Sequence, residues 1–399
     1  MKEPFLAAVP VLQKLEDAGF EAYFVGGSVR DFLLDKDIND VDIATSATPE
    51  EVKQVFSKTV DIGIEHGTVL VLYQNESYEI TTFRTETEYQ DYRRPKEVIF
   101  IRNLTEDLQR RDFTMNAIAM DKIGHLIDPF HGQRAIKEQI IQTVGQGAER
   151  FQEDALRMMR AVRFVSQLSF RIENETLASL SDLVHLLENI AVERKQAEFE
   201  KLLSGMDRKK ALQLIIETNI YSYLPGLVNQ KDRLTELLEF DCNHLNSREM
   251  WTLLVYCLQL EGKAIEEFFR DWRLPLNEIR VIQRISYFLK KRSDSTWSLY
   301  DLYAATKEIF ISAEKIYLVI NGIKDSDTIF HYLSVYEKLP IKERSEMNLT
   351  GNDLIEWYNQ NGGPWVKDKL LLVEQAIIDG NVSNDKRVIK EWLMECNHK

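Results

Sequence analysis

Cysteine, long apolar runs and positive charge are all scarce in this sequence of 399 residues. The cysteines at positions 242, 257 and 396 are odd in number and far apart, which argues against a disulfide framework or a thiolate metal cluster. No apolar run reaches the roughly 18 residues needed to cross a bilayer. The N-terminus lacks the charged and apolar regions of a signal peptide. We therefore expect a cytoplasmic protein with no membrane partner.

Positive charge is in deficit overall, since the formal net charge is -14. That sign is wrong for a protein that holds nucleic acid by its overall field, and it favours an acidic enzyme acting on small molecules. If RNA is the partner, basic residues must be concentrated locally. The seven histidines show no spacing typical of zinc ligands. A chain of this length with 44% hydrophobic residues can bury more than one core, so two to four units are expected.

The hydrophobic pattern changes along the chain. Residues 5–18 show helical spacing and residues 21–25 read as a short strand, and further strands are expected at 40–44, 68–73 and 77–83. Up to about residue 140 the pattern predicts a mixed α/β unit. Beyond residue 150, apolar residues recur at helical spacing and Gly and Pro are confined to short breaks. The remainder is therefore predicted to be all-helical.

Two carboxylates stand one residue apart at Asp40 and Asp42. In a strand they project from the same face, while Val41 and Ile43 point into a core. Such carboxylates repel each other unless a cation lies between them, and hard oxygen ligands suit Mg²⁺. The pattern predicts a catalytic metal site, although an ordinary polar turn at a strand end is the alternative.

A double glycine, Gly26-Gly27, follows the predicted strand at 21–25 and precedes a predicted helix that carries Arg30. Glycines there let backbone N–H groups approach a triphosphate, and Arg30 can reach the same phosphates. A double glycine is also a common turn. A phosphate cradle within about twenty residues of a carboxylate pair is the informative combination, and it predicts that Gly27 and Arg30 bind phosphate.

A later series, Asp154, Arg157, Arg160 and Arg163, recurs every three residues, which predicts one ridge of a helix. A salt-bridged amphipathic helix would show the same spacing, but the absence of acids between the arginines favours an anionic ligand. Cytosine and adenine both present an amino donor beside a ring acceptor, whereas guanine and uracil present the reverse. Because a carboxylate only accepts and a guanidinium only donates, Asp154 with Arg157 is expected to select C and A.

The segment from Gly26 to Ala44 resembles the head of the polymerase-β-type nucleotidyltransferases. Residues 110–117, Arg-Arg-Asp-Phe-Thr-Met-Asn-Ala, and residues 153–164 resemble the class II tRNA nucleotidyltransferases and their bacterial poly(A) polymerase relatives. The resemblance is specific over residues 20–205. It implies an α+β fold with a nucleotidyltransferase head at 1–140, a nucleotide-selecting neck at 141–205, a helical body at 206–275 and a helical, tRNA-binding tail at 276–399.

The same resemblance implies the chemistry and the site. Mg²⁺ on Asp40 and Asp42 would activate the 3′-hydroxyl of tRNA for displacement of pyrophosphate from CTP or ATP. A third acidic ligand is expected on a neighbouring strand, and Glu79 is the candidate, with an exposed strand glutamate as the alternative. Arg111, Arg160 and Arg163 would hold the nucleotide. Asp112 would contact the ribose or cap a helix, and a homodimer is expected.

Other segments favour a CCA-adding enzyme over a poly(A)-adding or partial one. The charged connection at 84–95 and the stretch at 63–69 resemble the CCA-adding version. Arg194 and Glu198 lie in a segment that resembles a neck motif supporting the nucleotide helix, or they form a surface pair. Basic clusters at 208–210, 290–292 and 357–369 are candidate tRNA contacts or solvated faces. A non-catalytic RNA-binding protein and a small-molecule nucleotidyltransferase remain as alternatives.

Overall fold

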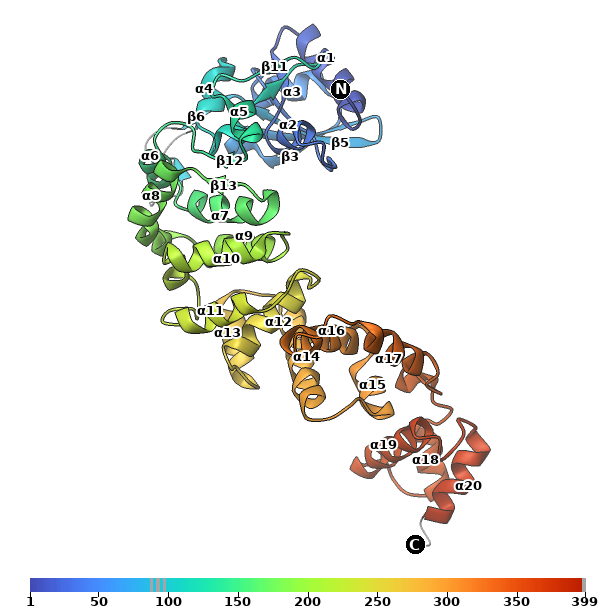
Figure 1. Ribbon diagram of the computed structural model, residues 1–399. Coiled ribbons are helices and arrows are strands. Elements are labelled where there is room, and N and C mark those ends of the chain that lie inside the picture. Colours follow the sequence, from blue (N-terminus) through green and yellow to red (C-terminus); the bar gives the residue numbers. More distant parts are fainter. Residues whose placement is uncertain (87–88, 91–93, 96–97, 397–399) are drawn as a thin grey trace. The chain divides into compact units, whose positions relative to one another are not determined.

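The computed structural model describes residues 1–86, 89–90, 94–95 and 98–396 (Figure 1). The chain divides into two compact units, Met1–Lys231 and Asp232–Lys399. The first unit combines a sheet with helices, and the second is built from helices. The predicted mixed fold is confirmed.

The first unit contains a sheet that has seven strands among the described residues, in the order β11-β10-β1-β2-β5-β4-β3. β2 pairs in parallel with β5, and the other neighbours are antiparallel. The strands are β1 (Ala22–Val25), β2 (Asp42–Thr45), β3 (Thr59–Gly63), β4 (Thr68–Tyr73), β5 (Glu76–Thr82), β10 (Ala119–Met120) and β11 (Leu126–Ile127). β2 begins at Asp42, so Asp40 lies just before the strand. The prediction that Asp40 lies on this strand was therefore wrong.

Short helices surround this sheet, and their apolar faces fill its core. In α1 the side chains of Phe5, Leu12 and Leu15 are buried, and the ring of Phe5 meets that of Phe24 on β1 edge to face at 4.9 Å. The other helices here are α2 (Gly27–Leu33), α3 (Pro49–Val55), α4 (Leu104–Gln109) and α5 (Gly132–Lys137), and α1 spans Phe5–Asp17. This part of the first unit also contains two 3-10 turns, η1 (Ile64–His66) and η2 (Thr114–Asn116). It has two further short strand pairs: β6 (Arg84–Glu86) with β9 (Val98–Phe100), and β7 (Tyr89–Gln90) with β8 (Arg94–Pro95).

Past residue 140 the first unit is mostly helical, with one exception. β12 (Ile140–Ile141) pairs in parallel with β13 (Arg171–Ile172), so the prediction of helix alone beyond residue 150 was wrong at this point. Two-residue strands carry too little alternation to be recognised in a sequence. The helices are α6 (Gly147–Glu153), α7 (Leu156–Leu168), α8 (Asn174–Leu183), α9 (Val192–Leu203) and α10 (Arg208–Glu217), with single turns η3 (Val184–Asn189) and η4 (Ile220–Tyr223).

α7 and α9 pack closely, because Gly205 at the end of α9 leaves room for Ser166 of α7. A Cβ at Gly205 would lie 2.1 Å from the Ser166 hydroxyl. That hydroxyl donates to the carbonyl of Leu202 at 2.6 Å. The contact holds the two helices that carry most of the charged residues described below.

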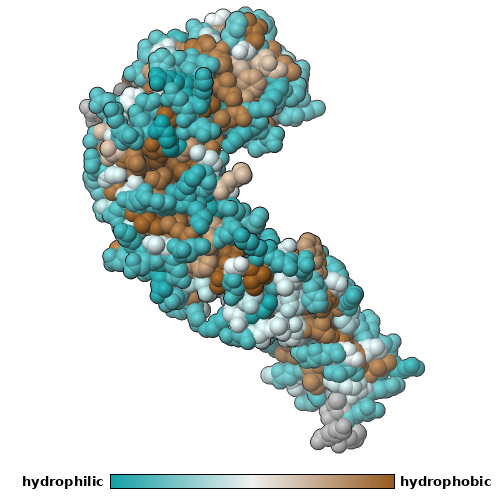
Figure 2. Space-filling view, viewed as in Figure 1, coloured by the Kyte–Doolittle hydropathy of each residue, from teal (hydrophilic) through white to brown (hydrophobic). Residues whose placement is uncertain are grey.

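The second unit is all-helical among the residues described, and its core is aromatic. Trp251 packs against Phe269 and Trp272 with ring centroids 5.5 and 4.9 Å apart. The helices are α11 (Lys231–Glu239), α12 (Ser247–Cys257), α13 (Lys263–Asp271), α14 (Leu276–Asp294), α15 (Leu299–Ala305), α16 (Lys307–Ile320), α17 (Asp327–Glu337), α18 (Gly351–Tyr358), α19 (Pro364–Ile378) and α20 (Lys386–Cys396), with η5 (Arg344–Glu346). Across the described ranges, every helix is too short or too polar to span a membrane. Figure 2 shows hydrophilic side chains over much of the visible surface.

Candidate active site

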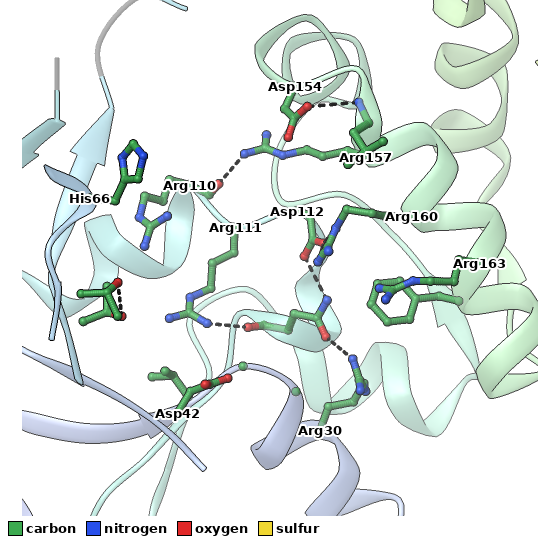
Figure 3. Close-up of a pocket in the computed structure, with 18 of the residues that line it drawn as sticks. Arg30, Asp42, His66, Arg110, Arg111, Asp112, Asp154, Arg157, Arg160 and Arg163 are labelled. Carbon is green, nitrogen blue, oxygen red and sulfur yellow. Dashed lines mark hydrogen bonds and ion pairs between the residues drawn. The ribbon is translucent and has the colours of Figure 1, made fainter. Parts of the chain in front are cut away.

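A cavity of about 750 Å³ opens in the first unit beside β1, α2, β2 and α7 (Figure 3). Its lining includes nine of the predicted site residues: Gly27, Arg30, Asp42, Arg111, Asp112, Asp154, Arg157, Arg160 and Arg163. Asp40 and Glu79 are not among the lining residues. Three aspartates and eight arginines of the described chain line it, the arginines being 30, 84, 110, 111, 157, 160, 163 and 194. The positive charge that the chain lacks overall is therefore concentrated at this cavity.

The glycine turn brings the sheet and the arginines together. Gly26 has φ 73° and ψ −137°, a conformation that favours glycine. A Cβ at Gly26 would lie 3.2 Å from Nη1 of Arg111 and 3.5 Å from Oδ2 of Asp42. The turn therefore requires glycine for its backbone angles and for the space that these two charged groups occupy.

The predicted alternation of exposed and buried side chains is present at residues 40–43, although only Asp42 and Ile43 lie on β2: Asp40 and Asp42 are exposed, while Val41 and Ile43 are buried. Asp42 pairs across the parallel strands with Glu79 of β5. Although Asp42 is accessible from the cavity, the protein packed around its carboxyl group raises its pKa by desolvation. The charges of Glu79 and Asp40 raise it further, against the opposing charge of Arg111. A cation at this edge would relieve that repulsion.

The carboxylates of Asp40 and Asp42 suit a metal ion whose remaining ligands are water or substrate oxygens. Within the described ranges, no three His, Cys, Asp or Glu side chains converge into a complete metal cage. A cation held at Asp42 must therefore take further oxygens from water or from a substrate. Mg²⁺ binds in this manner, through one or two carboxylates together with water and phosphate oxygens.

Asp154 does not lie on the helical ridge, contrary to the prediction. α6 ends at Glu153 and α7 begins at Leu156, and Asp154 between them has extended backbone angles of −140° and 102°. Its Oδ1 accepts a hydrogen bond from the N–H of Leu156 at 3.1 Å. Arg194 of α9 donates to both carboxylate oxygens, at 3.2 and 2.7 Å. Asp154 is thus fixed at the start of α7 by a two-pronged contact.

The three arginines of α7 all have carboxylate partners, although no acid lies between them in the sequence. Arg157 contacts Glu153 at 2.5 Å, Arg160 contacts Asp112 at 2.5 Å, and Arg163 contacts Glu198 at 2.9 Å. The salt-bridged helix, which was the alternative, is the observed arrangement. All three side chains nevertheless line the cavity.

Arg163 is buried to the same extent as Arg157, each being 8% exposed. Burial lowers the pKa of the Arg163 guanidinium to about 10, although the charge of Glu198 opposes the shift. The guanidinium lies 4.1 Å from the centroid of the Phe164 ring. Glu198 therefore supports α7 from α9, and the alternative of an Arg194–Glu198 surface pair is wrong.

Asp112 is buried and fully engaged. Its Oδ1 accepts from the N–H of Phe113 at 2.8 Å and from the amide of Asn116 at 2.9 Å, and its Oδ2 accepts twice from Arg160. Burial alone would raise the pKa of Asp112, but the charge of Arg160 and these bonds lower it to about 2. Asp112 is not the cap of η2, since Phe113 holds that position. A carboxylate has about four lone-pair positions, so a ribose hydroxyl would have to displace one of these bonds.

Several residues around the cavity were not predicted. Asp107 of α4 is 1% exposed and contacts Arg110 and Arg111 at 2.9 and 3.2 Å. The spacing of an acid three and four residues before two arginines is a signal that would have identified it. The contact of Asn116 with Arg30 and the contact of Arg194 with Asp154 carry no such signal, because these partners are 86 and 40 residues apart in sequence.

Two of the three candidate tRNA clusters are engaged within the protein. Arg208 is buried and donates to the carbonyl of Gly205 at 2.9 Å. Lys290, Lys291 and Arg292 pair with Glu261, Asp301 and Glu314 respectively. In the third cluster, Lys369 lies over the ring of Tyr358 at 5.5 Å. The connection at 84–95 lies partly outside the described residues, which exclude 87–88 and 91–93.

Comparison with known proteins gives matches along most of the chain. The family described as "Poly A polymerase head domain" matches residues 22–142, an "RNA and SrmB- binding site of polymerase A" matches 169–230, and "tRNA nucleotidyltransferase domain 2" matches 243–393. A CCA-adding enzyme of Geobacillus sp. (strain WCH70) is 48% identical over 401 residues, covering 100% of this chain and 98% of its own. One from Bacillus cereus (strain 03BB102) is 46% identical and covers 99% of both.

A solved structure is also similar over the whole length. It is the Bacillus stearothermophilus CCA-adding enzyme in complex with CTP, with 42% identity and a TM-score of 0.92, covering 100% of this chain and 98% of the other. The match covers the residues of both units.

Proposed function

Because this chain belongs to the family of CCA-adding enzymes, which are tRNA nucleotidyltransferases, we propose how its cavity builds the 3′-terminal CCA of tRNA from CTP and ATP. The observation that carries the proposal is the meeting of two elements in one cavity. Asp42 stands on one side, and Asp154 with Arg157 stands on another, with Arg111 between them (Figure 3).

Nucleotidyltransferases of this family generally use a divalent metal ion, and we assign Mg²⁺ to Asp40 and Asp42, with Glu79 as a possible third ligand. When bound, the ion would lower the pKa of the tRNA 3′-hydroxyl and neutralise charge on the departing pyrophosphate. The pKa of Asp42 is raised by burial and by the charges of Glu79 and Asp40, which a cation would offset, and this supports the assignment. We assign both aspartates as the catalytic carboxylates.

The triphosphate is assigned to the cationic side of the cavity. Gly27 is the first residue of α2 and lines the cavity without a side chain, so a phosphate can approach its backbone closely. Arg30, Arg111, Arg160 and Arg163 supply guanidinium donors that suit phosphate oxygens. Their partners hold these side chains in place before the nucleotide arrives, which reduces the entropy cost of binding.

Base selection is assigned to Asp154 and Arg157. The carboxylate of Asp154 accepts the exocyclic amino group of cytosine or adenine, and the guanidinium of Arg157 donates to the adjacent ring nitrogen. Guanine and uracil would place acceptor against acceptor and donor against donor. The bidentate grip of Arg194 keeps the Asp154 carboxylate from turning to suit them.

The remaining features of the molecule are proposed from the family resemblance. We assign residues 1–140 to the head, 141–205 to the neck, 206–275 to the body and 276–399 to a tRNA-binding tail, and we propose a homodimer. A cytoplasmic location is supported by Cys257, which is a free thiol buried in the second unit.

The experiment that tests this function supplies tRNA lacking CCA with CTP, ATP or both, and sequences the product ends. We expect CCA with both nucleotides. Asp42→Asn should reduce incorporation by at least about 10²-fold, because the metal loses a charged ligand. Its thermal midpoint should not fall, since the charges of Glu79 and Asp40 already disfavour ionised Asp42.

Asp61→Asn is the matched control. Asp61 is an exposed carboxylate on β3 of the same sheet and pairs with Lys53 at 2.7 Å. It should retain full incorporation. Products extended by A alone would indicate a poly(A)-adding enzyme, and normal activity of Asp42→Asn would refute the metal assignment.

A further inference from the structure

Asn116 is a buried amide between two parts of the proposed nucleotide site. It is the last residue of η2 and only 7% exposed, and it lines the cavity. Neither the phosphate grip nor the base selection described above assigns it a role. Figure 3 shows the side chains of Arg30, Arg111 and Asp112 converging on this region from different elements.

The side-chain oxygen, the side-chain nitrogen and the main-chain carbonyl of Asn116 are all hydrogen-bonded. Its Oδ1 accepts from Nη1 of Arg30 at 2.7 Å, and its Nδ2 donates to Oδ1 of Asp112 at 2.9 Å. Its main-chain carbonyl accepts from Nη1 of Arg111 at 3.4 Å. The amide can only be oriented one way, because the reverse would set NH₂ against a guanidinium and a carbonyl against a carboxylate.

These contacts form a continuous chain from α2 of the head to α7 of the neck: Arg30, Asn116, Asp112 and Arg160. Two guanidinium groups only donate, so Arg30 and Arg160 cannot bond to each other directly. An amide is the neutral group that accepts from one end of this chain and donates to the other. An aspartate at 116 would place a second carboxylate against Asp112.

We propose that Asn116 is a positioning residue that couples the grip of Arg30 on the triphosphate to the grip of Arg160, through Asp112. This inference rests on the proposed function. A nucleotide that seats its phosphates correctly against Arg30 thereby fixes Arg160 through the amide. The two guanidinium groups then hold the triphosphate cooperatively rather than independently.

A competing route exists through Phe164. The guanidinium groups of Arg30 and Arg160 lie 5.1 and 5.7 Å from the centroid of its ring. Coupling through the ring or through repulsion between the two charges would not require Asn116. A test must therefore separate the amide from these other routes.

The test is a double-mutant cycle on CTP affinity, measured by calorimetry with Mg²⁺ and without tRNA. Arg30→Lys and Arg160→Lys keep both charges and remove the forked donor geometry. In the presence of Asn116, we expect the effect on Kd of the double variant to differ from the product of the single effects by at least about threefold. In an Asn116→Ala background the effects should multiply. Because this readout is binding alone, its failure is distinct from a failure of CCA addition.

Thr114→Val is the matched control background. Thr114 lies in the same turn and is 5% exposed, and its hydroxyl has no hydrogen-bond partner in the described part of the chain. The coupling should persist there. Asn116→Asp, which keeps the side-chain shape, gives a second background in which coupling should vanish if Asn116→Ala does not fold. Coupling that survives in the folded Asn116 variants would overturn the proposal.

Discussion

At the scale of single residues, the proposed base selection depends on how firmly the Asp154 carboxylate is held. Arg194 reaches it from α9 with two hydrogen bonds, and the pair is partly shielded from solvent. Hydrogen bonds to charged groups contribute about 1.5–3 kcal/mol each when partly buried. We predict that Arg194→Ala lowers the preference for CTP over UTP by roughly tenfold or more, because a free carboxylate can turn. The ratio of kcat/KM values for the two nucleotides measures this.

Lys201→Ala provides the comparison on the same helix, at an exposed position. It should leave the nucleotide preference unchanged. If Arg194→Ala loses activity toward CTP and UTP in equal proportion, Arg194 supports the fold rather than the choice of base.

The lowered pKa of Asp112 implies that its contribution to the stability of the fold depends on pH. Its pKa is about 2 in the folded protein against an ordinary 3.8, so the folded state favours the ionised form. The corresponding stabilisation, about 2 kcal/mol, is fully present above pH 3.8 and is lost as the pH falls through 2. We predict that Asp112→Asn is less stable than the wild type at pH 7 and that the gap narrows below pH 4.

Urea unfolding followed by circular dichroism between pH 7 and pH 3 measures this gap, with Asp182→Asn at an exposed position of α8 as the control. A gap that stays constant down to pH 3 would contradict the prediction, because the stabilisation should already be falling below pH 3.8. A gap that widens on acidification would contradict it.

The residue types of this site were predictable, but the partners of its side chains were not. Local spacing identified Gly27, Arg30, Asp42 and the arginines of α7, all of which line the cavity. Asp112 and Arg160 are 48 positions apart, and Asp154 and Arg194 are 40 apart. Spacing within one helix shows which residues share its face, and it says nothing about the acid that another element places there.

At the scale of elements, the break between α6 and α7 places Asp154 where it can be clamped. The sequence pattern predicted one continuous ridge because residues 154, 157, 160 and 163 fit helical spacing. The extended backbone of Asp154 interrupts it, and the carboxylate then binds the N–H of Leu156 at the start of α7. Ser, Thr, Asp and Asn commonly bond to the free N–H groups at helix starts. A strand pattern, in contrast, was easily recognised where β4 and β5 alternate over six or seven residues.

In α14, a basic residue that the sequence offered as a tRNA contact is instead part of a buried ion pair. Arg292 donates to Glu314, which is 0% exposed, and lies 3.9 Å from the ring centroid of Tyr317. Removing one partner of a buried ion pair costs about 3–5 kcal/mol, because the other charge stays buried without compensation. We predict that Arg292→Ala strongly destabilises the second unit. Lys290→Ala on the same helix removes an exposed pair with Glu261 and should cost at most about 1 kcal/mol.

Tryptophan fluorescence during urea unfolding measures both variants, since all six tryptophans lie beyond residue 250, in the second unit. Equal midpoints for the two variants would contradict the assignment of Arg292 as a structural residue, and would restore it as a candidate for tRNA contact.

At the scale of the whole molecule, an acidic chain binds anionic substrates by local concentration of charge. The net charge is -14, yet eight arginines gather around the cavity of the first unit. Composition alone could not predict this, because folding brings together arginines from positions 30 to 194. The α+β class was predictable, since the change from strand to helical periodicity is visible along the chain. The division after Lys231 carried no compositional signal.

The central claim is that protein side chains take the place of a template strand in choosing C and A. The most direct measurement is the ratio of kcat/KM for CTP over UTP and for ATP over GTP, using purified enzyme and tRNA with the appropriate end. A site whose polar groups must all be matched should give ratios of roughly 10⁴ or more. Ratios near one would contradict the account.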